Sequence, residues 1–327
     1  MILAQFVHAR SCRECGFSLV ELTIAIALGV TLSFVVCHLL LQSKRSYVAS
    51  QALARMEDNG RYAMRYLSHE LRMAGHLADI DPRTRVRAMV LGSACFNFLM
   101  RTEVPFVHSN DVTEDGQPKI DVEALPGDCL LPGKHKAESD ILAVRRSASQ
   151  PSLLYGSHYA SVDSNDLFVS RQSEYHLPVL QRGRDVNRNG ASWLYQPQVL
   201  FVRNFSTLQG DNIPSLCRKR PGRSTNRMAP TECLIEGIEM LQIEYGLDDT
   251  GNLQIDRYVA APTADDLEQA VAARLYILVR SLREIAGHTD SRSYRLGSKV
   301  IPAARDGYLR RLMQTTVLLR NNAVMHL

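Results

Sequence analysis

Residues 17–41 read FSLVELTIAIALGVTLSFVVCHLLL, an apolar run in which Glu21 and His38 are the only ionisable side chains. A helix needs about 20 mainly apolar residues to cross the hydrocarbon core of a bilayer, so this run is long enough to span a membrane. A secretory signal has a shorter apolar core, about 7 to 15 residues, and ends at a small-residue cleavage site. No such site follows here. We therefore expect residues 17–41 to remain in the protein as a transmembrane anchor.

The charges beside this run leave its orientation open. Arg10 and Arg13 precede it, and Lys44 and Arg45 follow it. Cytoplasmic flanks usually carry the excess of basic residues, but the numbers on the two sides are equal here. The orientation must therefore be predicted from another feature.

The junction from Gly16 to Glu21, GFSLVE, supplies that feature. It resembles the GFxxxE processing and methylation site of type IV pilins and pseudopilins. The resemblance implies that residues 1–16 are a leader, that a prepilin peptidase cuts between Gly16 and Phe17, and that the new amino group of Phe17 is methylated. It also implies a single-pass protein of the inner membrane, with a cytoplasmic N-terminus before cleavage, a periplasmic head, and a place in the pilus after assembly.

Glu21 has a physical interpretation that does not depend on the resemblance. A carboxylate in a membrane helix is costly, by roughly 2.5–3.5 kcal/mol at the helix centre, and usually marks a function. After cleavage, the ammonium group of Phe17 would be its i, i+4 neighbour, and the positive end of the helix dipole would also favour it. In a filament, Glu21 could instead neutralise the terminus of an adjacent subunit. We expect it to act in assembly, and a tolerated interfacial glutamate is the alternative.

The chain after the anchor continues as an amphipathic helix. Apolar residues recur at helical spacing through residues 42–78, and the first proline after the anchor is Pro82. One continuous helix from Phe17 to about Ala74 is predicted, with Gly60 and Gly75 as weak points or ends. Residues 54–76, ARMEDNGRYAMRYLSHELRMAGH, are similar to the segment after the anchor in PilW-type minor pilins. Two further segments are similar to the same family, LQIEYGLDDTGN at 241–252 and LRRLMQTTVLLRNN at 309–322.

Residues 79–327 are expected to form an α+β head. Alternation at Leu241, Ile243 and Tyr245 is typical of a half-buried antiparallel strand. The strands predicted are 141–145, 167–170, 199–205, 238–245, 274–280 and 311–319, with a short helix over 263–272 and a hairpin turn at 248–252. The expected fold is therefore pilin-like, with a long N-terminal helix, half of it transmembrane, packed on a C-terminal antiparallel β-sheet.

The chain has seven cysteines, and four of them follow the anchor. Cys12 and Cys15 fall in the proposed leader and Cys37 in the anchor. In an oxidising periplasm, Cys95, Cys129, Cys217 and Cys233 can form two disulfides, in any of three pairings. We favour Cys95 with Cys129 and Cys217 with Cys233, because each bridge then closes a local loop.

The composition is that of a folded protein, and the sequence indicates no enzyme. Of 327 residues, 45% are hydrophobic and 22% charged, and the formal charge is only +4, so net charge does not predict nucleic acid as a partner. Common catalytic and nucleotide-binding motifs are absent from the sequence. No cofactor is expected apart from the calcium considered next.

Residues 185–190, DVNRNG, match the opening of a calcium-binding loop. Oxygens of Asp185, Asn187 and Asn189 could converge on one cation while Gly190 permits the turn. The match is incomplete, because Gln196 occupies the position of the bidentate glutamate. A plain turn needs the same residues and is the favoured interpretation.

The segment between Cys217 and Cys233 is basic. It holds Arg218, Lys219, Arg220, Arg223 and Arg227, and no acidic residue precedes Glu232. Such a loop could contact DNA phosphates or anionic surface polymers. It contains no aromatic residue to stack on bases, so a solvated loop is favoured over a nucleic-acid site.

The resemblance implies a structural function. The chain is expected to be a minor pilin that initiates or caps a type IV pilus and so supports pilus biogenesis, adhesion and twitching motility. Its partners would be other minor pilins, the major pilin, the inner-membrane assembly platform and the prepilin peptidase. One alternative is a minor pseudopilin of type II secretion. The other is a membrane-tethered periplasmic binding module for DNA or glycan.

Overall fold

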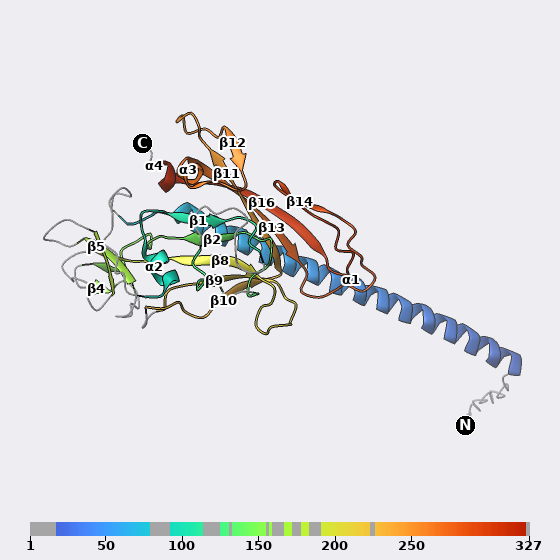
Figure 1. Ribbon diagram of the computed structural model, residues 1–327. Coiled ribbons are helices and arrows are strands. Elements are labelled where there is room, and N and C mark those ends of the chain that lie inside the picture. The colour runs from blue at the N-terminus through green and yellow to red at the C-terminus, as the bar shows by residue number, and fades with distance from the viewer. Residues whose placement is uncertain are drawn as a thin grey trace, which may run out of the picture. The chain divides into compact units, whose positions relative to one another are not determined.

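The computed structural model describes residues 18–78, 92–113, 125–130, 133–154, 157–158, 167–171, 178–182, 191–222 and 226–324. The chain divides into two compact units, Met1–Gln51 and Ala52–Leu327. The first holds the N-terminal part of one long helix. The second, called the head here, holds the rest of that helix and all the sheets (Figure 1).

The long helix, α1, spans Leu19–Met73 without a break. Its first turn is supported by Ser18, whose hydroxyl oxygen accepts a hydrogen bond from the N–H of Val20 at 3.3 Å. The helix ends just before Gly75, which has a φ of +76°. Glycine adopts this left-handed conformation without steric cost and commonly terminates helices. Gly75 is therefore an end, as predicted, whereas the helix passes straight through Gly60, so Gly60 is not one.

Three short helices and sixteen strands complete the described part of the chain. The helices are α2 (Ala94–Met100), α3 (Ala264–Glu268) and α4 (Arg320–Val324). The strands are β1 (Phe106–Ser109), β2 (Ile141–Val144), β3 (Leu153–Leu154), β4 (Ser157–His158), β5 (Leu167–Arg171), β6 (Pro178–Arg182), β7 (Ser192–Leu194), β8 (Gln198–Arg203), β9 (Ser215–Lys219), β10 (Glu232–Glu236), β11 (Ile238–Leu247), β12 (Arg257–Val259), β13 (Ala270–Arg280), β14 (Tyr294–Leu296), β15 (Lys299–Ile301) and β16 (Arg310–Leu318).

These strands form two main antiparallel sheets in the head. The first has the order β1-β2-β8-β9-β10, and the second has the order β12-β11-β13-β16 (Figure 1). A two-stranded ribbon, β14-β15, and a smaller sheet, β4-β3-β7-β5-β6, accompany them. Neighbouring strands are antiparallel throughout both main sheets. The predicted α+β fold is confirmed, with two main sheets in the head.

The main core lies where the second half of α1 meets both sheets. Met56, Ala63, Leu67 and Leu71 are spaced by seven, four and four residues, so they share one helix face, and all are buried. They belong to one cluster with residues of the first sheet, such as Leu200, and of the second sheet. Each fully buried leucine side chain contributes about 1.5–3 kcal/mol of hydrophobic stabilisation. This helix face therefore holds the two sheets together.

The second sheet is covered on both faces. Leu241, Ile243 and Tyr245 point into the main core and are fully buried, as their alternation predicts. The residues of β11 that alternate with them, such as Met240, were expected to face water. Met240 is instead buried in a separate cluster that includes Tyr294 of the β14-β15 ribbon. The ribbon comes from a distant part of the chain, so the half-buried pattern of β11 did not reveal it.

The other predicted elements compare well with the structure. All six predicted strands occur, with ends shifted by one or more residues. The turn at 248–252 follows β11, and the Asp248 carboxylate accepts hydrogen bonds from the N–H groups of residues 250–253. The helix predicted over 263–272 ends at Glu268. Thr263 caps it, but residues 270–280 form β13, because pairing with β11 and β16 on both sides outweighs helix propensity there.

Candidate functional site: an apolar helix and a basic hairpin

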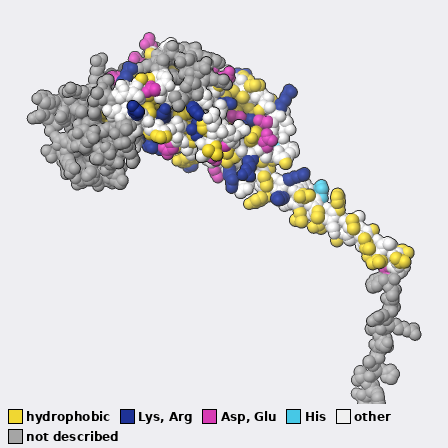
Figure 2. All heavy atoms as spheres, turned by 60° about the horizontal axis from the view of Figure 1, so that its bottom comes forward, with side chains coloured by type: hydrophobic (Ala, Val, Ile, Leu, Met, Phe, Trp, Pro, Cys, Tyr) yellow, Lys and Arg dark blue, Asp and Glu magenta, His cyan; other side chains and the backbone are white. Residues whose placement is uncertain are grey.

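The N-terminal part of α1 presents apolar side chains on all sides. Its large hydrophobic residues between Leu19 and Leu41 have exposed fractions from 47% to 79%. Figure 2 shows these hydrophobic side chains along the helix surface. The helix is long and apolar enough to cross a membrane, judged by length and composition. A surface of this kind is stable only in lipid or against other apolar helices.

The two threonine hydroxyl groups on this helix surface bond within the helix. The Thr23 hydroxyl donates to the Val20 carbonyl oxygen at 2.8 Å, and the Thr31 hydroxyl donates to the Leu28 carbonyl oxygen at 2.9 Å. Lipid offers no water to polar groups, so an unpaired hydroxyl would be costly there. Such internal bonds would let the helix carry these threonines within a membrane.

Glu21 lies in the first turn of α1. Among the residues that the structure describes, none forms an ion pair or hydrogen bond with its carboxylate. The proposed cleavage and methylation residues, Gly16 and Phe17, lie outside the described residues. A carboxylate in a membrane would need a positive partner, and the described part of this chain does not supply one.

The basic segment of the head is a hairpin of β9 and β10 that is closed by a disulfide. Cys217 and Cys233 lie opposite each other in the strand register and are bonded. The second bridge joins Cys95 to Cys129. These are the two bridges of the sequential pairing. Cys37 is an exposed free cysteine on α1.

Glu232 partly neutralises the hairpin. Arg218 donates from Nε to the Glu232 carboxylate at 3.0 Å, and Arg220 donates from Nη2 at 3.1 Å. The bonds and charge of Arg218, together with the charge of Arg220, lower the pKa of Glu232 below its usual value. Lys219 donates to the main-chain oxygen of Asp128, and burial lowers the pKa of its ammonium group. The hairpin is therefore less basic than its sequence indicates.

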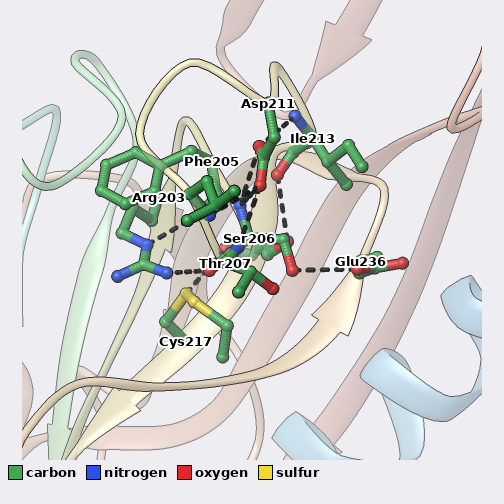
Figure 3. The surroundings of a disulfide bond; sticks show 11 residues. Arg203, Phe205, Ser206, Thr207, Asp211, Ile213, Cys217 and Glu236 are labelled. Carbon is green, nitrogen blue, oxygen red and sulfur yellow. Dashed lines mark hydrogen bonds between the residues drawn. A yellow bond between two sulfur atoms is a disulfide. The ribbon is translucent and has the colours of Figure 1, made fainter.

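A loop with many internal hydrogen bonds lies beside this hairpin, between β8 and β9 (Figure 3). The carboxylate of Asp211 accepts hydrogen bonds from four main-chain N–H groups, those of Ser206, Thr207, Leu208 and Ile213. Desolvation would raise the pKa of Asp211, but these bonds outweigh it and lower the pKa. The Ser206 hydroxyl also donates to Glu236 at 2.9 Å. The loop is thus fixed to the end of β10.

A groove of about 1260 Å³ runs along the head next to this loop. Its walls come from α1, from β10 and from β16, which are the edge strands of the two main sheets. Arg61, Arg65 and Arg311 line it together with Asp58 and Glu236. β10 and β16 each pair with one neighbouring strand only, and edge strands of this kind have unpaired main-chain groups.

The predicted calcium residues, Asp185, Asn187 and Asn189, lie outside the described residues. Within the described ranges, no three His, Cys, Asp or Glu side chains are grouped so that they could hold a metal ion.

The structure brings together residues that the sequence analysis did not connect. Glu70 on α1 binds Arg146, which follows β2, through two hydrogen bonds of 2.6 and 2.8 Å.

The comparisons with known proteins agree with the resemblance seen in the sequence. Residues 200–321 match the family PilW, described as Type IV Pilus-assembly protein W. This range contains one of the three segments that resemble PilW proteins, 241–252, and all but the last residue of another, 309–322. The similarity to PilW-type, pilin-like proteins is therefore confirmed for this part of the chain. No curated protein matches the sequence significantly.

One solved structure overlaps most of the chain. It is a type IV-like pilin from Thermus thermophilus, 14% identical, with a TM-score of 0.37 over 82% of this chain and 97% of the other. A TM-score of this size does not establish a common fold. The fold assignment therefore rests on the chain's own elements.

Proposed function

We propose that this chain is a minor pilin, a non-enzymatic subunit that is anchored in the inner membrane by α1 and assembles through α1 with other pilin-like subunits. The observation that carries the proposal is an apolar helix exposed along its first half, with a carboxylate at Glu21 that has no partner among the described residues. The match of residues 200–321 to PilW supports a place in type IV pilus assembly rather than in another membrane-anchored system.

The proposed arrangement places the leader in the cytoplasm and the head in the periplasm. After cleavage at Gly16, the Phe17 ammonium group of one subunit pairs with Glu21 of its neighbour. An unpaired charge in lipid is expensive, so this pairing would favour one axial register between helices. Partners of this kind are other minor pilins and the major pilin. Initiation or capping of the pilus, with support of adhesion and motility, follows from such assembly.

The Glu21→Gln variant tests this proposal. Glutamine keeps the size of the side chain and removes its charge, so membrane insertion should be unchanged or easier, and the head should keep both disulfides. Co-purification with other minor pilins from membranes, and the number of surface pili, should fall strongly. Piliation and partner binding at the original level would contradict the proposal.

His38→Gln serves as the matched control. It changes the other ionisable side chain of the same apolar run, one that lies well beyond the first turn. Because His38 has no role in the proposed pairing, this variant should assemble normally. Equal losses in both variants would indicate a general defect of the anchor instead of a specific pairing.

Two other candidate functions have some support. A minor pseudopilin of type II secretion would share the leader and the anchor with a minor pilin. Deletion of the gene would impair secretion if the chain is a pseudopilin, and pilus assembly if it is a minor pilin. A membrane-tethered binding module is favoured by the hairpin that carries Arg218, Lys219 and Arg220. Such a module would function normally with Gln at position 21.

A further inference from the structure

A second cavity of about 400 Å³ lies in the head, away from the groove described above. Its walls come from α1, from the connection between β7 and β8, and from the basic hairpin. Its charged lining residues are Arg146, Arg218, Arg220 and Glu70. We call this cavity the arginine pocket.

One side of the arginine pocket is a buried ion pair. Glu70 is 1% exposed, and both its carboxylate oxygens bind the guanidinium of Arg146. Arg146 also donates from Nη1 to the side-chain oxygen of Gln196 at 2.5 Å. A bidentate pair of this kind is geometrically rigid, and Glu70 uses both its oxygens on Arg146. Little negative charge is left for the pocket.

The opposite side carries an excess of positive charge. Arg218 and Arg220 line the pocket and share one carboxylate, that of Glu232, which is itself half exposed and not part of the lining. Arg220 makes no other side-chain hydrogen bond to a described residue. Burial would lower the pKa of Arg218, but bonds to Glu232 and to the Tyr66 hydroxyl outweigh it and raise the pKa. The Arg218 guanidinium group therefore remains charged.

The neutral polar groups of the pocket are also donors. The Tyr66 hydroxyl accepts from Arg218 at 3.2 Å and donates to the side-chain oxygen of Gln198 at 2.8 Å. The amide oxygens of Gln196 and Gln198 are thus both occupied. Their Nε2 groups have no hydrogen-bond partner in the part of the head that the structure describes. A pocket that offers donors and few free acceptors fits an oxygen-rich anion.

We propose that the arginine pocket binds an acidic sugar unit of a polysaccharide, through a carboxylate or phosphate group held by Arg218, Arg220 and the glutamine amides. The planar guanidinium fork matches both of these groups. Leu167, Leu194 and Pro197 give the pocket apolar walls suited to the C–H face of a sugar ring. Nucleic acid fits less well, because Tyr195 is buried and Tyr66 is packed against the main core, so neither aromatic lining residue is an exposed platform for a base.

This inference does not depend on assembly through α1, and its test does not involve pili. Full-length protein in detergent micelles is titrated by calorimetry with glucuronic acid, glucose 6-phosphate, glucose and a single-stranded DNA oligonucleotide. At least one of the two acidic sugars should bind, more weakly as salt rises, and glucose should not. The carboxylate and phosphate probes show which anion the pocket prefers.

Arg220→Gln is the decisive variant. Its side chain is half exposed, so the fold should be unaffected, and the affinity for the acidic sugar should fall about tenfold or more. Arg227→Gln is the matched control. Arg227 lies exposed on the same hairpin but outside the pocket, so its loss changes the net charge equally and should leave the affinity nearly unchanged.

Three results would overturn the proposal. The first is no binding of either acidic sugar. The second is an equal loss of affinity in the two variants, which would show diffuse charge attraction without a pocket. The third is binding of the oligonucleotide alone, which would identify the hairpin as a nucleic-acid surface.

Discussion

Gly60 of α1 lies so close to Met313 of β16 that a Cβ atom at position 60 would stand 2.6 Å from the Met313 sulfur. The same atom would stand 3.0 Å from Cγ2 of Val279. The absence of a side chain at Gly60 is what allows the helix to approach the second sheet at this point. Glycine is poor in helix interiors, so here close packing outweighs helix propensity.

Gly60→Ala should destabilise the head. Alanine gains about 1 kcal/mol in helix propensity, but overpacking a core costs about 1–3 kcal/mol. The flexible Met313 side chain can shift, whereas the branched Val279 is held in its sheet, so we expect a net loss of about 1 kcal/mol. Denaturant unfolding of the full chain in detergent, followed by fluorescence of Trp193, measures it. Trp193 is the only tryptophan.

Gly29→Ala is the control for this prediction, because a Cβ atom at Gly29 meets nothing within 4 Å. It should leave the unfolding of the head unchanged. Adding Met313→Ala to Gly60→Ala should recover part of the steric loss. If Gly60→Ala alone stabilises the head, the close approach to the sheet is not a constraint.

The two disulfides should contribute unequally to stability. Cys95 and Cys129 are 34 residues apart, and Cys217 and Cys233 are 16 apart. A typical bridge contributes about 2–4 kcal/mol, and loop-closure entropy makes the longer loop worth about 0.7 kcal/mol more. Paired Cys→Ala replacements of each bridge, compared by denaturant unfolding, test this order. A reducing agent should lower the free energy of unfolding of the unreplaced protein by the sum of the two losses. No effect of reduction would contradict the prediction.

Stability of the head should fall in acid. Arg310 donates hydrogen bonds to Asp306 at 2.5 and 2.7 Å, and these bonds lower the pKa of Asp306. A depressed carboxyl pKa contributes stability that is fully present above the unfolded pKa of about 4, and this stability is lost as pH falls through the folded pKa. Denaturant midpoints should therefore be level near neutral pH and drop below about pH 4.

Asp306→Asn isolates this contribution. The variant should be less stable at neutral pH and should lose less stability on acidification than the original protein. Arg310 keeps its bonds to Glu239, so the network should survive the change. An acid-induced loss of unchanged size in Asp306→Asn would show that other carboxylates are responsible.

Processing provides a prediction about the N-terminus. In cells with a prepilin peptidase, mass spectrometry should find a mature chain that begins with methylated Phe17. Replacement of Gly16 by a larger residue should leave the leader attached, while a Ser18→Ala control should be cut normally. Protein that starts at Met1 in peptidase-containing cells would contradict the pilin interpretation.

The sequence by itself determined the features that depend on neighbouring residues. The long helix follows from apolar spacing and from the absence of proline, and Gly75 marks its end. The strands 238–245 and 274–280 follow from alternation of side chains, and the turn at 248–252 from its Asp and Gly residues. The favoured disulfide pairing also joined cysteines that are close in sequence. Each of these signals is local, so sequence reasoning could find it.

The tertiary structure alone decided which distant residues meet. Glu70 and Arg146 are 76 residues apart, and Arg218 and Tyr66 are 152 apart. Nothing in the local sequence relates the members of either pair, because their contact depends on how α1 packs on the sheets. The same packing adds a ribbon over β11 and turns part of a predicted basic loop into one wall of a pocket. Side-chain spacing specifies each element, whereas burial of their apolar faces against one another specifies which polar groups are brought together.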